Sequence, residues 1–159
     1  MIKDIPKNML DELSRLITTH TGLYFPEKKL NALKKGLNFV INDLGMDIYQ
    51  LFQCLQTSPS QEVIDAITTR LTIGETYFLR DKNFFQILQD HILRGIIKHP
   101  KRKTKKIIFW SAGCATGEEP YSIAILVDQM RPVLKDWDIT IIGSDINPLA
   151  LNKAKKGIY

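Results

Sequence analysis

The chain has 159 residues, of which 44% are hydrophobic and 25% charged, a composition typical of a globular protein with one core or two small ones. No apolar run approaches the roughly 20 residues needed to cross a membrane, and the N-terminus does not resemble a signal peptide, so we expect a cytoplasmic protein. The two cysteines and three histidines lack metal-ligand spacing, and we therefore expect reduced thiols and no metal site.

The net charge of +5 comes from one part of the chain. Residues 1–95 carry 11 Lys and Arg against 11 Asp and Glu, whereas residues 96–159 carry 11 against 6. Six of those bases cluster between residues 98 and 106, where no aromatic side chain is interleaved to stack on nucleic-acid bases. We interpret this cluster as a solvated linker and expect no nucleic-acid partner.

The first 80 residues have the apolar spacing of an all-α helical bundle. Apolar side chains recur at helical spacing over residues 9–17, 30–44 and 48–55. Gly45 stands where a left-handed residue would end the second of these helices. A fourth helix is predicted up to Leu71, with Ser58–Gln61 as a capping box that places Pro59 at the first helical position. We assign residues 1–80 to an N-terminal helical domain.

The next segment predicts a long helix that runs into the basic cluster. Its apolar stripe extends from Phe84 to Ile96, and Pro100 follows it. We assign residues 81–105 to this linking helix and the basic linker.

From Lys106 onward the pattern changes to alternating strand and helix. Ile107–Trp110 and Ile139–Ile142 are short apolar runs, typical of parallel strands covered on both faces. Thr116 and Glu119 have the spacing of a capping box for the helix between them, and a further helix begins at Asn147-Pro148 and ends near Gly157. Residues 106–159 are thus predicted to form the first βαβα portion of an α/β Rossmann-like domain, which would be incomplete.

The turn after the first predicted strand has features of a nucleotide-type cofactor site. Gly113 and Gly117 allow a tight turn and a close approach to a ligand, and the N–H groups at the following helix start favour negative charge or lone pairs. Asp145 follows the second strand, where a carboxylate can accept hydrogen bonds from both hydroxyls of a ribose. Ala115 replaces the middle glycine of a pyrophosphate loop, which favours an adenosine ligand without phosphates.

Two glutamates at the start of this helix allow two interpretations. Glu118 and Glu119 can complement the helix dipole, each contributing about 0.3–1 kcal/mol. Alternatively, one of them faces the ligand and holds an ammonium group, as a cofactor with an amino-acid tail would require. The two interpretations are compatible.

Three segments together resemble the CheR-type chemotaxis receptor methyltransferases. They are Arg70–Arg80, Trp110–Ala124 with its TGEEPYSIA run, and Gly143–Asn147 with the ending Lys155–Tyr159. The resemblance extends over the whole chain, helical domain included. It implies an enzyme that transfers the methyl group of S-adenosylmethionine to glutamate side chains on the cytoplasmic helices of chemoreceptors. The cofactor product is S-adenosylhomocysteine.

The same resemblance implies the site residues. Those expected to bind the cofactor are Gly74, Thr76, Arg80, Gly113, Glu118 and Asp145. Glu118 would hold the methionine ammonium, Asp145 the ribose, and Arg80 would also be catalytic by orienting the substrate carboxylate. Because a glutamate with a pKa of about 4.3 is already ionised at neutral pH, methyl transfer needs no general base. Positioning can supply on the order of 7–11 kcal/mol instead.

Two strands are fewer than a fold of this kind needs. Because a two-stranded parallel sheet cannot bury both faces, we expect a fragment, a chain that self-associates by swapping elements with a copy, or poor order after the linker. We accordingly expect this chain alone to be inactive. The alternatives are a non-catalytic module that binds cofactor or receptor and, less favoured, a nucleic-acid methyltransferase, whose basic surface should extend beyond one linker.

Overall fold

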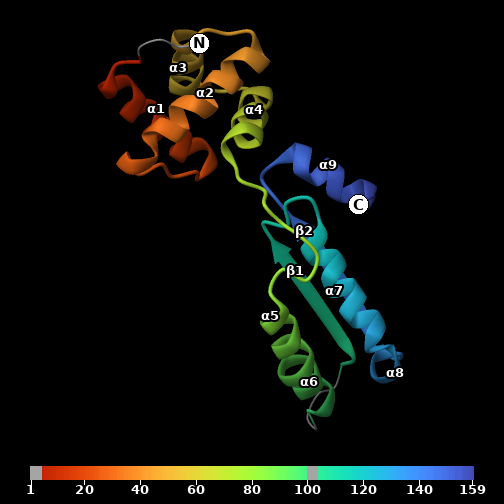
Figure 1. Cartoon of the computed structure of the whole chain (residues 1–159). Helices are drawn as coiled ribbons and strands as arrows, with labels where there is room; N and C mark the ends of the chain where they lie inside the picture. The colour runs from red at the N-terminus through yellow and green to blue at the C-terminus, as the bar shows by residue number, and fades with distance from the viewer. Residues whose placement is uncertain (1–4, 100–103) are drawn as a thin grey trace. The chain divides into compact units, whose positions relative to one another are not determined.

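A computed structural model describes residues 5–99 and 104–159 of the chain (Figure 1). The chain divides into two compact units, Met1–Ile73 and Gly74–Tyr159. The sequence-based division lies after residue 80 instead. Residues 74–80 belong with the second unit in the structure, where the Leu79 N–H donates to the Ser122 hydroxyl oxygen at 2.9 Å.

The described part of the first unit is entirely helical, which confirms the prediction of an all-α N-terminal part. Its elements are α1 Lys7–Thr21, the 3-10 helix η1 Glu27–Lys29, α2 Leu30–Leu44, α3 Ile48–Gln56 and α4 Gln61–Leu71. The apolar stripes of all four α-helices meet in one core, because each helix carries its apolar residues on one face. The most deeply buried members are Leu13, Ile17, Leu33, Leu37, Val40, Leu51, Leu55 and Ile67.

The ends of these helices agree with the sequence in one case and differ in another. Gly45 ends α2 in the left-handed conformation, with φ of 62°, as predicted. The predicted start of α4 was wrong by two residues, because Ser60 and not Ser58 is the N-cap. The Ser60 hydroxyl accepts the Val63 N–H at 3.4 Å, so Pro59 precedes the helix.

The second unit combines helices with two strands. Its elements are α5 Lys82–Ile87, the π-helical turn η2 Leu88–Leu93, α6 Arg94–Lys98, β1 Lys106–Ala112, α7 Glu118–Gln129, α8 Arg131–Leu134, β2 Asp138–Ser144 and α9 Pro148–Lys156. Residues 82–98 form one continuous helix with a π-turn at its centre, because the junction residues Leu88 and Arg94 keep right-handed helical angles. The predicted long helix is therefore present. No helix in residues 5–99 or 104–159 is long and apolar enough to cross a membrane.

The two strands pair in parallel, with Ile107 opposite Ile139 and Phe109 opposite Ile141. These four side chains point to one face of the sheet, where they pack with residues of both the 82–98 helix and α7. Both helices run alongside β1 (Figure 1). All the described helices that pack on the sheet through this core therefore cover the same face.

The other face of the sheet is largely exposed. Ile108, Trp110 and Ile142 are 58%, 71% and 47% exposed. Among the described residues the helices pack against one side only, so the apolar runs alone were wrong in predicting cover on both faces, whereas the expectation that a two-stranded sheet cannot bury both faces agrees with the structure.

The last helix begins and ends as the sequence predicts. The Asn147 side-chain oxygen accepts the Ala150 N–H at 3.0 Å, and Pro148 is the first helical residue. Gly157 follows α9 with φ of 60°, the left-handed conformation that closes many helices.

Candidate functional site

The turn between β1 and α7 is built from left-handed residues. Gly113, Ala115 and Gly117 have φ values of 78°, 47° and 101°. A side chain at Gly113 would meet no atom within 4 Å, whereas one at Gly117 would lie 2.4 Å from the Tyr159 hydroxyl and 2.9 Å from the Ala154 Cβ. Gly113 therefore borders open space that a ligand can enter, and Gly117 allows close packing inside the unit.

Asp145 joins this turn to the end of β2. Its Oδ2 atom accepts the Ala115 N–H at 2.8 Å, and its Oδ1 atom accepts the Asn147 N–H at 2.8 Å. Hydrogen bonds to a carboxylate are stronger than neutral ones, so the first bond stabilises the left-handed Ala115. The turn and the acid, two separate signals in the sequence, are thus in direct contact.

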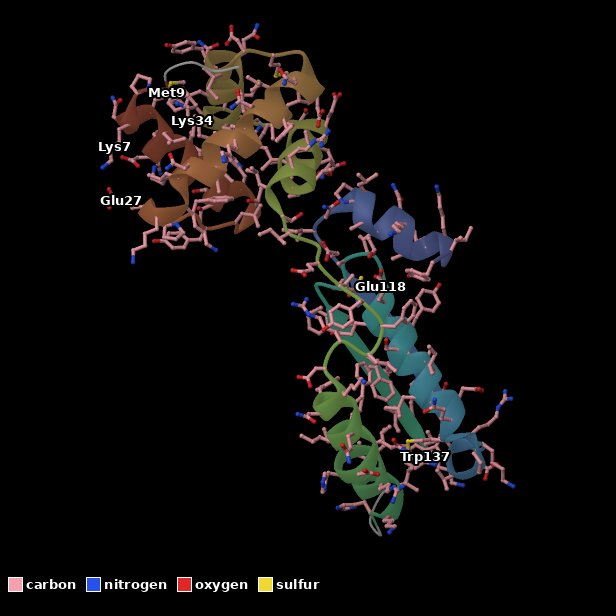
Figure 2. The ribbon with its side chains drawn as sticks, in the orientation of Figure 1. Lys7, Met9, Glu27, Lys34, Glu118 and Trp137 are labelled. Carbon is pink, nitrogen blue, oxygen red and sulfur yellow. The ribbon has the colours of Figure 1, made fainter. Side chains whose placement is uncertain are left out.

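Glu118 is a buried carboxylate at the N-terminus of α7 (Figure 2). It is 8% exposed, and its Oε2 atom accepts the Thr116 hydroxyl at 2.6 Å. Among residues 5–99 and 104–159, no lysine, arginine or histidine forms an ion pair with it. The positive end of the helix dipole offsets part of the cost of burying this charge, and a ligand cation would offset more.

The predicted capping box between Thr116 and Glu119 does not form. Gly117 is the N-cap and has no side chain to accept a hydrogen bond, while the Thr116 hydroxyl donates to Glu118 instead. The Glu119 carboxylate is exposed and accepts the Ser111 hydroxyl at 2.7 Å. The left-handed Gly117 delays the helix start by one residue, which changes the residue that each side chain can reach.

The loop before α5 begins at Gly74, next to the turn of residues 113–117, here called the glycine turn. A Cβ built on Gly74 would lie 3.6 Å from the Ala115 Cβ, so the loop backbone is next to the turn. Thr76 is half-buried in the same loop. The structure thus brings Gly74 together with the turn that carries Gly113 and contacts Asp145.

Arg80 lies at the far end of this loop with its side chain exposed. Its guanidinium donates to the Glu75 carbonyl oxygen and lies 5.9 Å from the centre of the Tyr77 ring. The residue before it, Leu79, has a left-handed φ of 53°. Among the described contacts, those of the Arg80 side chain are therefore with its own loop.

Sequence reasoning missed two residues that hold the site together. Ser122 is fully buried, accepts the Leu79 N–H and donates to the Glu118 carbonyl at 2.6 Å. Tyr159 donates its hydroxyl to the Thr116 carbonyl at 2.7 Å. Ser122 could have been noticed as a polar residue one helical turn after Glu118, on the face that α7 buries. No local signal identifies the partner of Tyr159.

The other candidate groups near the turn do not suggest a metal. Burial, with the Asp145 carboxylate adding to it, raises the pKa of the Cys114 thiol above its ordinary value of 9.0, so the thiol is protonated at neutral pH. Within the part of the chain that the structure describes, no group of three or more His, Cys, Asp or Glu could hold a metal ion.

Comparison with known proteins gives the same boundary as the structure. Residues 74–159, the second compact unit, match the family model described as "CheR methyltransferase, SAM binding domain". The chain is 34% identical to "Chemotaxis protein methyltransferase 2" of Vibrio cholerae, over 87% of this chain and 48% of that protein. It is 30% identical to "Chemotaxis protein methyltransferase" of Escherichia coli, over 92% of this chain and 49% of that protein.

A third relative covers nearly all of the chain. The match to "Chemotaxis protein methyltransferase" of Borreliella burgdorferi is 28% identical over 98% of this chain and 56% of that protein. Both units are therefore included in the similarity. The chain spans about half the length of the curated relatives it matches.

Proposed function

Since this chain belongs to the CheR methyltransferase family, we propose that it takes part in methyl transfer from S-adenosylmethionine to glutamate side chains of chemotaxis receptors. The products would be glutamate methyl esters and S-adenosylhomocysteine. The partners would be the cytoplasmic helices of chemoreceptors, and the site of action the cytoplasm. The observation that carries the proposal is the direct hydrogen bond between the glycine turn and Asp145, beside a buried Glu118 that forms no ion pair with any residue that the structure describes.

The proposed organisation places the domain boundary after Ile73, seven residues before the boundary expected from the sequence. Residues up to Ile73 would be the helical domain, and the unit from Gly74 would hold the linking helix and linker and, from residue 106, the first βαβα portion of a Rossmann-like methyltransferase domain. The parallel pairing of β1 with β2 and the intervening α7 support a crossover unit of this kind.

The residues present suit an adenosine ligand with an amino-acid tail. Each Asp145 carboxylate oxygen accepts one backbone N–H and keeps capacity for a ribose hydroxyl. Glu118 lacks a cationic partner among the described residues, which an ammonium group would supply. Gly113 borders open space, so ligand atoms can approach the backbone there. The proposed cofactor-binding set is Gly74, Thr76, Arg80, Gly113, Glu118 and Asp145.

Arg80 is the proposed catalytic residue. When bound, S-adenosylmethionine supplies a methyl group activated by its sulfonium. The Arg80 guanidinium has five N–H donors, and its contact with the Glu75 carbonyl leaves donors for a bidentate contact with a substrate carboxylate. Holding the ionised glutamate in line is the main task, for which positioning can supply on the order of 7–11 kcal/mol.

A second candidate is a non-catalytic module that binds cofactor or receptor. The apolar face of the sheet that carries Trp110, a residue 71% exposed, favours this candidate. Parallel sheets are normally covered on both faces, so a sheet with one bare face suits a unit that binds a partner better than a finished catalytic domain. Self-association through exchanged elements belongs to the same alternative.

Two assays on the 159-residue chain separate these candidates. Transfer of a radiolabelled methyl group to a chemoreceptor cytoplasmic fragment would support the proposed enzyme. Calorimetric binding of S-adenosylhomocysteine without transfer would favour the module, and neither binding nor transfer would refute both cofactor roles. Asp145→Ala should abolish binding, and Asp138→Ala, at the other end of the same strand, should leave it unchanged.

A further inference from the structure

Three aromatic side chains meet at the glycine turn, with Tyr159 in the middle. The Tyr159 ring lies 5.0 Å from the Phe78 ring and 5.5 Å from the Tyr121 ring, centre to centre, and both pairs have edge-to-face geometry. Such pairs add to the stability of a cluster beyond the area they bury. Phe78 belongs to the loop of Arg80, and Tyr121 to the first turn of α7. Tyr159 therefore links three segments of the second unit.

The Tyr159 hydroxyl is packed against the backbone of the turn. It donates to the Thr116 carbonyl oxygen at 2.7 Å. A Cβ at Gly117 would lie only 2.4 Å from it, so the absence of a side chain at Gly117 is what admits the hydroxyl. The hydroxyl thus contacts the two residues that directly precede Glu118.

Thr116 connects the Tyr159 hydroxyl to the Glu118 carboxylate. The Thr116 carbonyl accepts from Tyr159, and the Thr116 hydroxyl donates to Glu118 Oε2 at 2.6 Å. Burial, and next the negative charge of Glu118, raise the pKa of Tyr159 above its ordinary value near 10, so the phenol is a donor at neutral pH. A chain of two hydrogen bonds therefore runs from Tyr159 to the buried carboxylate.

We propose that Tyr159 is a positioning residue of the cofactor site, whose hydroxyl acts through Thr116 to hold the Glu118 carboxylate where it receives the ammonium of S-adenosylmethionine. This role rests on the proposed function. The role predicts a selective effect. Loss of the hydroxyl should lower the affinity for ligands that carry the ammonium and leave the affinity for ligands without it unchanged.

The test compares two nucleosides on Tyr159→Phe, which removes the hydroxyl and keeps the ring against Phe78 and Tyr121. S-adenosylhomocysteine carries the amino-acid tail, and 5′-methylthioadenosine has the same adenosine and thioether without it. Calorimetry should show that Tyr159→Phe weakens S-adenosylhomocysteine about fivefold, the equivalent of roughly 1 kcal/mol for one lost hydrogen bond. The affinity for 5′-methylthioadenosine should be the same in Tyr159→Phe as in the unaltered chain. Equal losses for both ligands, or no loss for either, would overturn the proposal.

The control variant is Tyr24→Phe, at an exposed tyrosine of the helical unit, which should change neither affinity. Amide hydrogen exchange without ligand gives a second measurement. The amides of Gly117 and Tyr121, which donate to the carbonyls of Cys114 and Gly117, should exchange faster in Tyr159→Phe, while those of the helical unit should not change.

This second measurement tests the role of Tyr159 in the turn separately from the binding of cofactor. If the unaltered chain binds neither nucleoside, the proposed function fails, and with it the role toward the ammonium. The exchange rates then decide whether the hydroxyl holds the turn, and unchanged rates at Gly117 would overturn that part as well.

Discussion

Replacing Ser122 by alanine should release the loop that ends in Arg80. Ser122 is fully buried, and its oxygen accepts the Leu79 N–H at 2.9 Å. Leu79 has φ of 53°, a left-handed conformation that costs a residue with a side chain about 1–2 kcal/mol. The hydrogen bond from Ser122 offsets that cost and fixes the backbone that leads into Arg80.

The size of the effect follows from the group left behind. Ser122→Ala leaves the Leu79 N–H without its acceptor, for which about 1–3 kcal/mol is typical. The lost donation to the Glu118 carbonyl adds little, because it is a bond within one helical turn. We expect urea unfolding of the second unit to show a free energy of unfolding lower by about 1–2 kcal/mol. This is less than the full cost, because the Leu79 N–H can donate to water once the loop is released.

A double-mutant cycle identifies the cause. Leu79→Gly removes the backbone strain, because glycine adopts positive φ freely. Ser122→Ala should therefore cost about 1 kcal/mol more in the Leu79→Gly background, because release of the loop relieves no strain there. The matched control is Ser111→Ala, a buried serine whose hydroxyl donates to the exposed Glu119 carboxylate and leaves no backbone group unpaired. Equal costs for Ser122→Ala and Ser111→Ala, or an additive cycle, would refute the reasoning.

Three further predictions concern the turn and its neighbours. Gly117→Ala should destabilise the second unit by about 2–4 kcal/mol in urea unfolding, since it adds left-handed strain and overpacking against Ala154, and a cost no larger than that of Gly113→Ala, where space is open, would contradict this. Ellman's reagent should modify half-buried Cys54 about tenfold faster than Cys114, whose burial and raised pKa disfavour the thiolate; equal rates would argue against the buried turn. Because the pKa of Tyr159 is raised in the folded state, the contribution of its hydroxyl to stability is present below pH 10 and is lost as the pH rises through the folded pKa. Above pH 10 the free energy of unfolding should therefore fall more steeply with pH than in Tyr159→Phe. Identical slopes would count against the contact between Tyr159 and the turn.

Local pattern was enough to predict much of the fold. The helical stripes of the first unit repeat over many residues, and each stripe is the face that the core buries. Gly45 and Gly157 mark helix ends because a left-handed residue closes a helix through bonds to the turn just before it. The Asp145 side chain could be placed at the edge of the sheet because it follows a strand directly.

Other features depend on contacts that local pattern does not contain. The bonds from Leu79 to Ser122 and from Tyr159 to Thr116 each join residues 43 positions apart. The capping box at Thr116 failed because the left-handed Gly117 turned that side chain toward Glu118. The apolar run at Ile107–Trp110 predicted burial on both faces, but apolarity alone does not say how many layers of helix pack against a strand.

The most direct test of the account is an amide chemical-shift titration of the 159-residue chain with S-adenosylhomocysteine, which detects weak as well as tight binding. We expect saturable shifts within residues 74–159, largest at Gly113, Ala115, Gly117 and Asp145, with residues 5–73 unchanged and the response lost in Asp145→Ala. No saturable shift at millimolar ligand, or shifts centred in the helical unit, would contradict the claim that the glycine turn and Asp145 form the cofactor site.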